Sequence, residues 1–288
     1  MSHARVLVVL LLLAAVCAHA DTDYFAPENL KKFAESLYSE GDFLRAAGEY
    51  QRYLLVADAT VDRTPVLLRI GQCFRQGGEP LKAAGYFTQV LTRNPDPATG
   101  EQAATELARA YFDAHDDTRT LATLDAHPAH AVPYPYQQQL LRGLVYVRRQ
   151  AWVKAVAALT PGPGLSNDES AELTELRQMA DKGAHLHYKS RLMAGVLSAL
   201  LPGAGKLYAG RPKDALGTLM ILGSTSYLAY RAFQADGRGS AWGWVYGAFS
   251  AGLYAGDIYG AAVAVQVTND SHAQQVVHQV EVSCGLPL

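Results

Sequence analysis

The chain has 288 residues, of which 49% are hydrophobic and 18% are charged, and its formal net charge at pH 7 is −2. A length of this size allows about two domains. A balance so close to neutral argues against nucleic-acid binding, which usually requires a basic patch, and against an acidic disordered chain. The charges are unevenly distributed, with one in residues 1–20, 41 in residues 21–191 and eight in residues 192–269. This distribution predicts a leader, a soluble domain and a membrane-compatible segment.

Residues 1–20 have the pattern of a secretory signal peptide. Arg5 supplies the positive charge, residues 6–16 form an unbroken apolar run, and Ala18-His19-Ala20 offers the small residues that signal peptidase requires. Eleven apolar residues are too few to span a bilayer core, which needs about 20. Cleavage after Ala20 is therefore the main prediction. An uncleaved anchor is an alternative, as is lipidation at Cys17, although the bulky Val16 before it disfavours lipidation.

Residues 21–165 contain a repeated pattern of small and aromatic residues around a glycine. The first set recurs 37 residues later, a third set lies 72 residues beyond the second, and a weaker set falls between them at Leu107, Ala108, Tyr111 and Leu124. The three clear sets are Ala34, Leu37, Gly41, Phe43, Ala46 and Tyr50; Gly71, Phe74, Gly78, Pro80, Ala83 and Phe87; and Gly143, Tyr146, Gln150, Trp152, Ala155 and Leu159. This pattern resembles the tetratricopeptide (TPR) repeat, in which small residues let paired helices approach. It predicts an all-α, TPR-like solenoid.

The resemblance implies a concave groove for a protein or peptide partner. In the repeat register the groove is lined by first-helix residues, namely Lys31, Glu35, Tyr38, Arg69, Gln72, Arg75, Arg109 and Phe112. The alternative is that these residues form an ordinary solvated face. We expect neither an enzyme nor a metal or cofactor site, because the chain shows no nucleophile elbow or phosphate loop. The histidines His115, His127 and His130 lie in a proline-rich connection without fixed ligand spacing.

Residues 166–191 are predicted to form a capping helix and a linker. Pro161-Gly-Pro-Gly interrupts the preceding helix, and Ser166-Asn-Asp-Glu169 has the pattern of a capping box. The helix is expected to end near Gly183, before a basic linker that suits a headgroup zone. Of the two cysteines outside the leader, Cys73 is expected to be a buried thiol and Cys284 a loose one.

Residues 192–269 are predicted to hold a helical membrane hairpin. Two windows, 215–234 and 241–263, are long enough to cross a bilayer, and a polar turn around Gly237 and Gly239 separates them. Gly252, Gly256 and Gly260 repeat every four residues, which favours close helix packing in lipid, either inside the hairpin or between copies of the chain. The tail, 270–288, is predicted to be a loose strand or helix.

Residues 202–211, PGAGKLYAGR, resemble the PGxGxxYxGR signature of small bacterial proteins with a two-helix membrane hairpin, and Tyr254–Gly260 resembles the ending of related envelope proteins that carry TPR repeats. This resemblance covers residues 28–160 and 188–269. Together with the glycine spacing it gives the predicted hairpin packing positions, which are Gly203, Gly205, Tyr208, Gly210, Gly252, Gly256, Asp257 and Gly260. Asp257 stands where the pattern has Asn. A carboxylate inside a membrane helix marks a functional candidate, with Lys206, Arg211 or Lys213 as partner; the alternative is a solvated position near the interface.

Two topologies remain open from the sequence. If residues 192–210 cross the membrane the tail is cytoplasmic, and if they only dip into it the tail returns outside. The sequence predicts a bacterial inner-membrane protein with its repeat domain in the periplasm, acting as an adaptor that binds a protein partner and lipid but no nucleic acid. The alternative is an oligomeric membrane component, such as a pore or an insertion accessory.

Overall fold

The computed structural model describes residues 25–93, 95–130 and 133–285, so the predicted signal peptide lies outside the described residues. Every regular element in the described part is helical, which confirms the all-α class. The internal contacts divide the chain into two units, one ending at Val145 and the other beginning at Tyr146. Each unit is described by itself.

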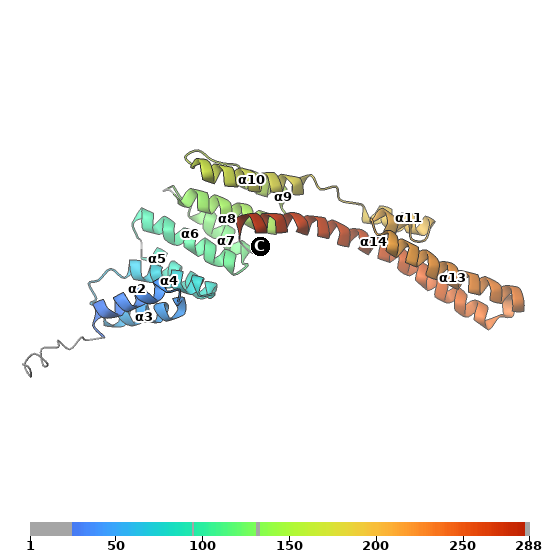
Figure 1. Ribbon diagram of the computed structural model, residues 1–288, viewed down its shortest axis with the longest axis horizontal. Helices are drawn as coiled ribbons and strands as arrows, with labels where there is room; N and C mark the ends of the chain where they lie inside the picture. Colours follow the sequence, from blue (N-terminus) through green and yellow to red (C-terminus); the bar gives the residue numbers. More distant parts are fainter. Residues whose placement is uncertain (1–24, 94, 131–132, 286–288) are drawn as a thin grey trace, which may run out of the picture. The chain divides into compact units, whose positions relative to one another are not determined.

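The first unit is a succession of helices that pack on their neighbours along the chain (Figure 1). They are α2 (Pro27–Ser39), α3 (Phe43–Val56), α4 (Thr64–Gln76), α5 (Pro80–Thr92), α6 (Pro97–Asp113), α7 (Asp117–Ala126) and the greater part of α8 (Tyr134–Arg148). Proline stands in the first turn of α2, α4, α5 and α6, where its missing N–H has no helical partner to lose.

Left-handed residues end the first helix of each pair at a regular interval. Gly41 and Gly78 have φ of +82° and +80°, as a residue without Cβ readily adopts. His115 and Gln150 occupy the next two equivalent positions with φ of +56° and +54°. The turn therefore persists through the weak third set, although the glycine that marks it in the sequence has been replaced.

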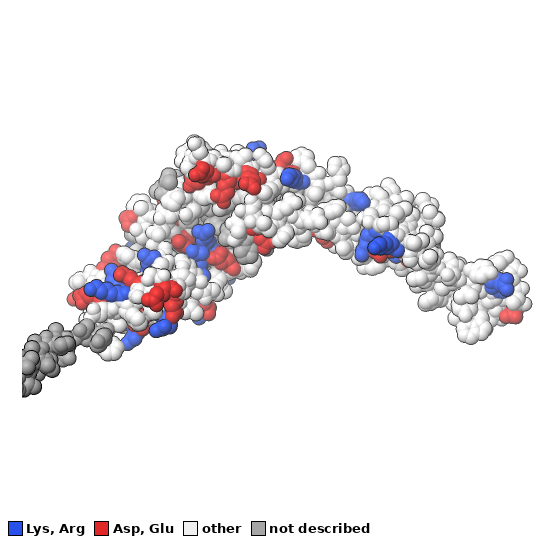
Figure 2. Space-filling view, viewed as in Figure 1, with Lys and Arg blue, Asp and Glu red and all other residues white. Residues whose placement is uncertain are grey.

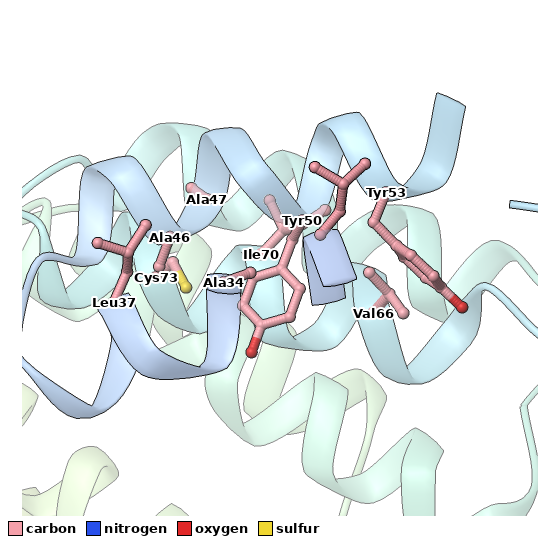
Figure 3. Close-up of a cluster of buried hydrophobic side chains, with 10 residues drawn as sticks. Ala34, Leu37, Ala46, Ala47, Tyr50, Tyr53, Val66, Ile70 and Cys73 are labelled. Carbon is pink, nitrogen blue, oxygen red and sulfur yellow. The ribbon is translucent and has the colours of Figure 1, made fainter. Parts of the chain in front are cut away.

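Small and aromatic residues alternate in the core of the first unit. Ala34, Ala46 and Ala47 are fully buried and let α2 and α3 approach, while the Tyr50 ring fills the space beside them (Figure 3). At Gly71 on α4 a Cβ would lie 2.5 Å from the Phe87 ring of α5, so this contact requires glycine. The repeated small positions are thus close helix contacts.

The second unit begins with α9 (Trp152–Ala158) and α10 (Asn167–Ala184). The predicted capping box is present: the Glu169 amide donates to Ser166 Oγ at 3.2 Å, and the Ser166 amide donates to Glu169 Oε2 at 2.9 Å. Gly183 lies under Trp152, whose ring would be 2.5 Å from a Cβ at that position. The unit continues with α11 (Arg191–Leu200), α12 (Ala204–Tyr208), α13 (Pro212–Asp236), the 3₁₀ turn η1 (Gly237–Gly239) and α14 (Ala241–Cys284).

Helix α14 is 44 residues long, about 66 Å. The helix begins at Ala241 and runs without a break to Cys284, so it continues beyond the predicted window of 241–263, and the tail, which was predicted to be a loose strand or helix, is helical. Its last part packs on α10, where Ala273, Val276, Val277 and Val280 are buried at helical spacing. The Ser283 hydroxyl also donates to Glu175 Oε1 at 3.1 Å.

Residues 189–210 form a helical reversal against α14. At its start the Lys189 amide donates to Asn269 Oδ1 at 3.1 Å, and at the end of α11 the Ala199 carbonyl accepts from the Tyr254 hydroxyl. Helix α12 then returns, so that the Ala209 carbonyl accepts from the Thr268 hydroxyl at 3.2 Å. The chain thus enters and leaves the reversal at the same level of α14. Helix α11 is only about 15 Å long, about half the thickness of a hydrocarbon core.

Candidate functional site

The strongest polar cluster in the second unit surrounds Asp257, in the middle of α14. Its side chain is 1% exposed, and Oδ2 accepts a hydrogen bond of 2.8 Å from the Gly203 amide. That amide is available because the chain breaks helix α11 at Pro202 and takes a left-handed conformation at Gly203, with φ of +82°. The alternative of a solvated Asp257 was wrong, because the break at Gly203 offers the carboxylate a buried donor.

Lys206 supplies the opposite charge. Its Nζ lies 2.9 Å from Asp257 Oδ1 and donates at 2.6 Å to the Thr218 hydroxyl on α13. The ammonium is aligned with the hydroxyl rather than with Oδ1, which accepts no well-directed hydrogen bond. The 2.9 Å between the two charged groups makes this contact an ion pair. It joins α12, α13 and α14 at one point.

Two glycines make this approach sterically possible. A Cβ at Gly203 would lie 2.7 Å from the Ala215 carbonyl oxygen, and one at Gly205 would overlap the Ala194 carbonyl and lie 2.6 Å from the Ala261 methyl. The Gly205 amide donates to the buried Ser198 hydroxyl at 3.2 Å. Both positions therefore serve backbone contacts inside the helical reversal.

A second group of contacts closes the reversal at its open end. Lys189 Nζ donates to the Tyr208 carbonyl at 2.8 Å, and the Tyr208 hydroxyl accepts from the Ser190 amide at 3.2 Å. The Asn269 amide nitrogen donates to the Lys189 carbonyl at 3.0 Å, completing a reciprocal pair with α14. Gly210, with φ of +86°, then turns the chain into α13.

The predicted packing positions thus fall into two groups. Gly203, Gly205, Tyr208, Gly210, Asp257 and Gly260 lie together at the reversal, and a Cβ at Gly260 would lie 3.6 Å from Lys206 Cε. By contrast, a Cβ at Gly252 or Gly256 would meet no atom of the described residues within 4 Å. These two line a cavity of about 490 Å³ together with Lys206, Gly217, Thr218 and Asp257.

The predicted groove residues of the first unit form two contact groups. The Arg69 guanidinium lies 4.6 Å from the centre of the Tyr38 ring and donates to Gln72 Oε1 at 3.1 Å. Arg75 forms ion pairs with Glu106 at 3.1 Å and Asp113 at 3.3 Å. These contacts link α2 to α4 and α4 to α6.

The remaining predicted groove residues are not part of these groups. Lys31 and Glu35 are exposed on α2, and Arg109 is partly buried on α6. The assignment of Phe112 to the groove was wrong, since its side chain is 3% exposed and belongs to the interior.

Two polar groups escaped sequence reasoning. Thr218 lies in the uncharged window 215–234, and nothing local marks it as the partner of a lysine 12 residues earlier. Gln138 is buried in the first unit, where its amide nitrogen donates to the Thr105 hydroxyl and the His127 carbonyl, both at 3.0 Å. Its side-chain oxygen accepts from the Ala129 amide at 3.1 Å. Gln138 therefore fixes the irregular connection after α7.

Within the described residues, only α14 is both long and apolar enough to cross a membrane, and 28% of its most apolar window is buried. Large hydrophobic side chains are exposed along α11, α13 and the first part of α14. Figure 2 shows charged side chains over the repeat helices and a mostly uncharged surface over these segments. No group of three metal-ligating side chains was found in the described part of the chain.

No family model matches the chain, and neither a curated protein nor a solved structure shows significant similarity to it.

Proposed function

We propose that the chain is a membrane-anchored adaptor, in which a TPR-like repeat domain binds a protein or peptide partner and α11–α14 hold it at a membrane. The observation that carries this proposal is the continuity of α14. Its first part is apolar and exposed, and its last part is built into α10, the helix that follows the repeats. One rigid element therefore links the anchor to the repeat cap.

The lengths in the second unit suit a bilayer. From Ala241 to Asn269, α14 extends about 43 Å, close to the thickness of a bilayer with its headgroups. Helix α11 is about half as long as the hydrocarbon core is thick. In this arrangement α11 and α12 form a re-entrant segment, with the broken backbone at Gly203 buried in protein, as irregular structure inside a membrane requires.

The tip at Gly237 then faces one side of the membrane, and the repeat domain and the tail face the other. The leader predicts that the repeat side is the periplasm of a bacterial envelope. Lys189, Arg191 and Arg211 also lie on the repeat side and would favour the cytoplasm under the positive-inside rule. We propose that export by the leader prevails over this bias.

Alkaline phosphatase fusions test the topology. A fusion after residue 288 should be active and an insertion at Gly237 inactive. The reverse result would place the repeats in the cytoplasm and overturn the assignment of the leader. Activity at both positions would contradict the re-entrant arrangement.

Partner binding is tested by photo-crosslinking in the full chain. Crosslinkers at Lys31, Glu35 and Arg69 should capture a common partner, while one at the exposed Leu55 on α3 serves as the matched control. Capture from Leu55 alone would show that the first-helix face is an ordinary solvated surface.

The second candidate function is an oligomeric membrane component. It is favoured by Gly252 and Gly256, where an added Cβ would meet no atom of the described residues within 4 Å. Small residues spaced by four allow helices of two copies to touch. A cysteine at Gly252 would then form a disulfide between copies in membranes. Gly252→Leu and Gly256→Leu would abolish function, whereas an adaptor would tolerate both changes.

A further inference from the structure

A second cavity, separate from the Asp257 cluster, lies between α11 and α14. It has a volume of about 750 Å³. Small residues create it, because Gly195 and Ala199 on α11 and Ala255 and Ala262 on α14 leave space that larger side chains would fill. Tyr259 forms part of its wall. We call this cavity the α11–α14 groove.

The groove is apolar except at one end. Arg191, the first residue of α11, is the one charged residue among those that line it. Its side chain is exposed, and none of the ion pairs among the described residues involves it. Lys189 and Asn269, which close the reversal, mark the same end. The groove therefore combines an apolar length with a single cationic end.

These dimensions suit one leaflet of a bilayer. Arg191 and Ala199 are eight residues apart, about 12 Å along the helix, against about 15 Å for half of a hydrocarbon core. In the anchored arrangement Arg191 lies at headgroup level on the repeat side, and Ala199 lies near the middle of the bilayer. A guanidinium group recognises a phosphate by paired, charge-assisted hydrogen bonds.

We propose that the α11–α14 groove binds an anionic phospholipid, with one acyl chain against Gly195 and Ala199 and the phosphate on Arg191. The inference rests on the proposed function, because it requires that α11 enter a membrane. It goes further in naming the lipid class, the leaflet and the residue that selects the headgroup.

Gly195 gives a test that separates groove from fold. A Cβ at this position would meet only Ile258, at 3.9 Å, which is ordinary van der Waals contact. Gly195→Leu should therefore fill the groove and leave the backbone in place. Arg191→Gln removes the phosphate ligand and keeps the groove. Arg238→Gln, in the turn at the opposite tip, is the matched control for loss of a positive charge.

The experiment is native mass spectrometry of the full-length protein in detergent, titrated with phosphatidylglycerol or with phosphatidylcholine of the same acyl chains. The unmodified protein should retain one phosphatidylglycerol in preference to phosphatidylcholine. Arg191→Gln should reduce phosphatidylglycerol binding about tenfold, Gly195→Leu should reduce the binding of both lipids, and Arg238→Gln should behave as the unmodified protein.

The failures can be told apart. Equal phosphatidylglycerol binding by Arg191→Gln and the unmodified protein would overturn the headgroup assignment. Undiminished lipid binding by Gly195→Leu would show that the α11–α14 groove is not the lipid site. An unmodified protein that forms a dimer and retains no lipid would show the same. Release of the unmodified protein from membranes by alkaline carbonate would instead refute the membrane anchor itself. A protein that stays in membranes yet binds both lipids equally would refute only the lipid site.

Discussion

Replacing Asp257 by Asn should destabilise the second unit far more than an equivalent change at an exposed ion pair. The change keeps the size of the side chain and an acceptor for the Gly203 amide. It removes the charge that faces Lys206 at 2.9 Å. The ammonium then remains in its site with only the Thr218 hydroxyl as partner.

The expected size of the effect follows from the burial of the pair. Removing one partner of a buried ion pair costs about 3–5 kcal/mol, because the remaining charge is left uncompensated. Asp257 is 1% exposed but Lys206 is 21% exposed, so solvent can relieve part of the penalty. We therefore expect a loss of about 3 kcal/mol. Asp214→Asn is the control, since its pair with Arg211 is 46% and 47% exposed and should contribute at most about 1 kcal/mol.

Unfolding of the purified full-length protein by SDS in mixed micelles, followed by tryptophan fluorescence, measures both free energies. All three tryptophans, Trp152, Trp242 and Trp244, belong to the second unit and report on it. The double variant Lys206→Met with Asp257→Leu should recover much of the loss, as a hydrophobic pair replaces a charged one. Two results would show that the ion pair does not hold the reversal together. One is equal stability of Asp257→Asn and Asp214→Asn. The other is a double variant whose loss of stability equals the sum of the losses of Lys206→Met and Asp257→Leu measured singly.

Three further predictions concern packing, pH and charge. Gly205→Ala should cost about 1–3 kcal/mol because its Cβ would overlap a carbonyl oxygen, whereas Gly252→Ala should be neutral or stabilising by up to about 1 kcal/mol; equal effects in the same SDS titration would contradict the contacts. Burial raises the pKa of Tyr50 to about 12 and that of Cys73 to about 11. The folded protein thus holds these protons more tightly than the unfolded chain, so thermal stability should be intact below pH 9 and fall as the pH rises to 11 and 12. Tyr50→Phe should flatten this fall in melts followed by circular dichroism, and an unchanged profile would refute the assignment. Arg75→Met should lower the melting temperature by the equivalent of about 1–2 kcal/mol, since its two carboxylate partners lose a charge-assisted bond; an unchanged melting temperature would show that this contact contributes nothing.

Much of the first unit could be predicted because its signals are local. Gly41 and Gly78 predict the left-handed turn, because glycine adopts a positive φ readily. The later turns at His115 and Gln150 carry no such mark, because tertiary packing imposes the conformation on residues that rarely adopt it. Phe112 holds the same place in its repeat as Arg75, 37 residues earlier, but its apolar side chain is buried. The repeat register gives the position of a side chain on the helix, but the residue type decides whether that side chain stays at the surface or enters the core.

The second unit was harder because its key contacts are distant in sequence. Asp257 and Gly203 are separated by 54 residues, and their pairing exists only because Pro202 and Gly203 interrupt a helix. The continuation of α14 had a readable signal, since Ala273, Val276, Val277 and Val280 recur at helical spacing. The polar residues around Asn269 indicate an end to the apolar helix, and for that reason the continuation of α14 was not predicted.

On the proposed function, the helical reversal changes what the anchor can do. A single membrane helix on a flexible linker tethers a domain but leaves its orientation open. Here the capping helix α10 packs on the last part of α14, where Glu175 accepts from Ser283, and the linker that follows α10 is bound to the same helix through Lys189 and Asn269, some 20 Å away. Two separated attachments to the same helix resist rotation as well as translation. On the proposed function, α10 would therefore be held at a defined angle to the membrane, and replacing residues 270–272 by glycines should remove that constraint while leaving insertion intact.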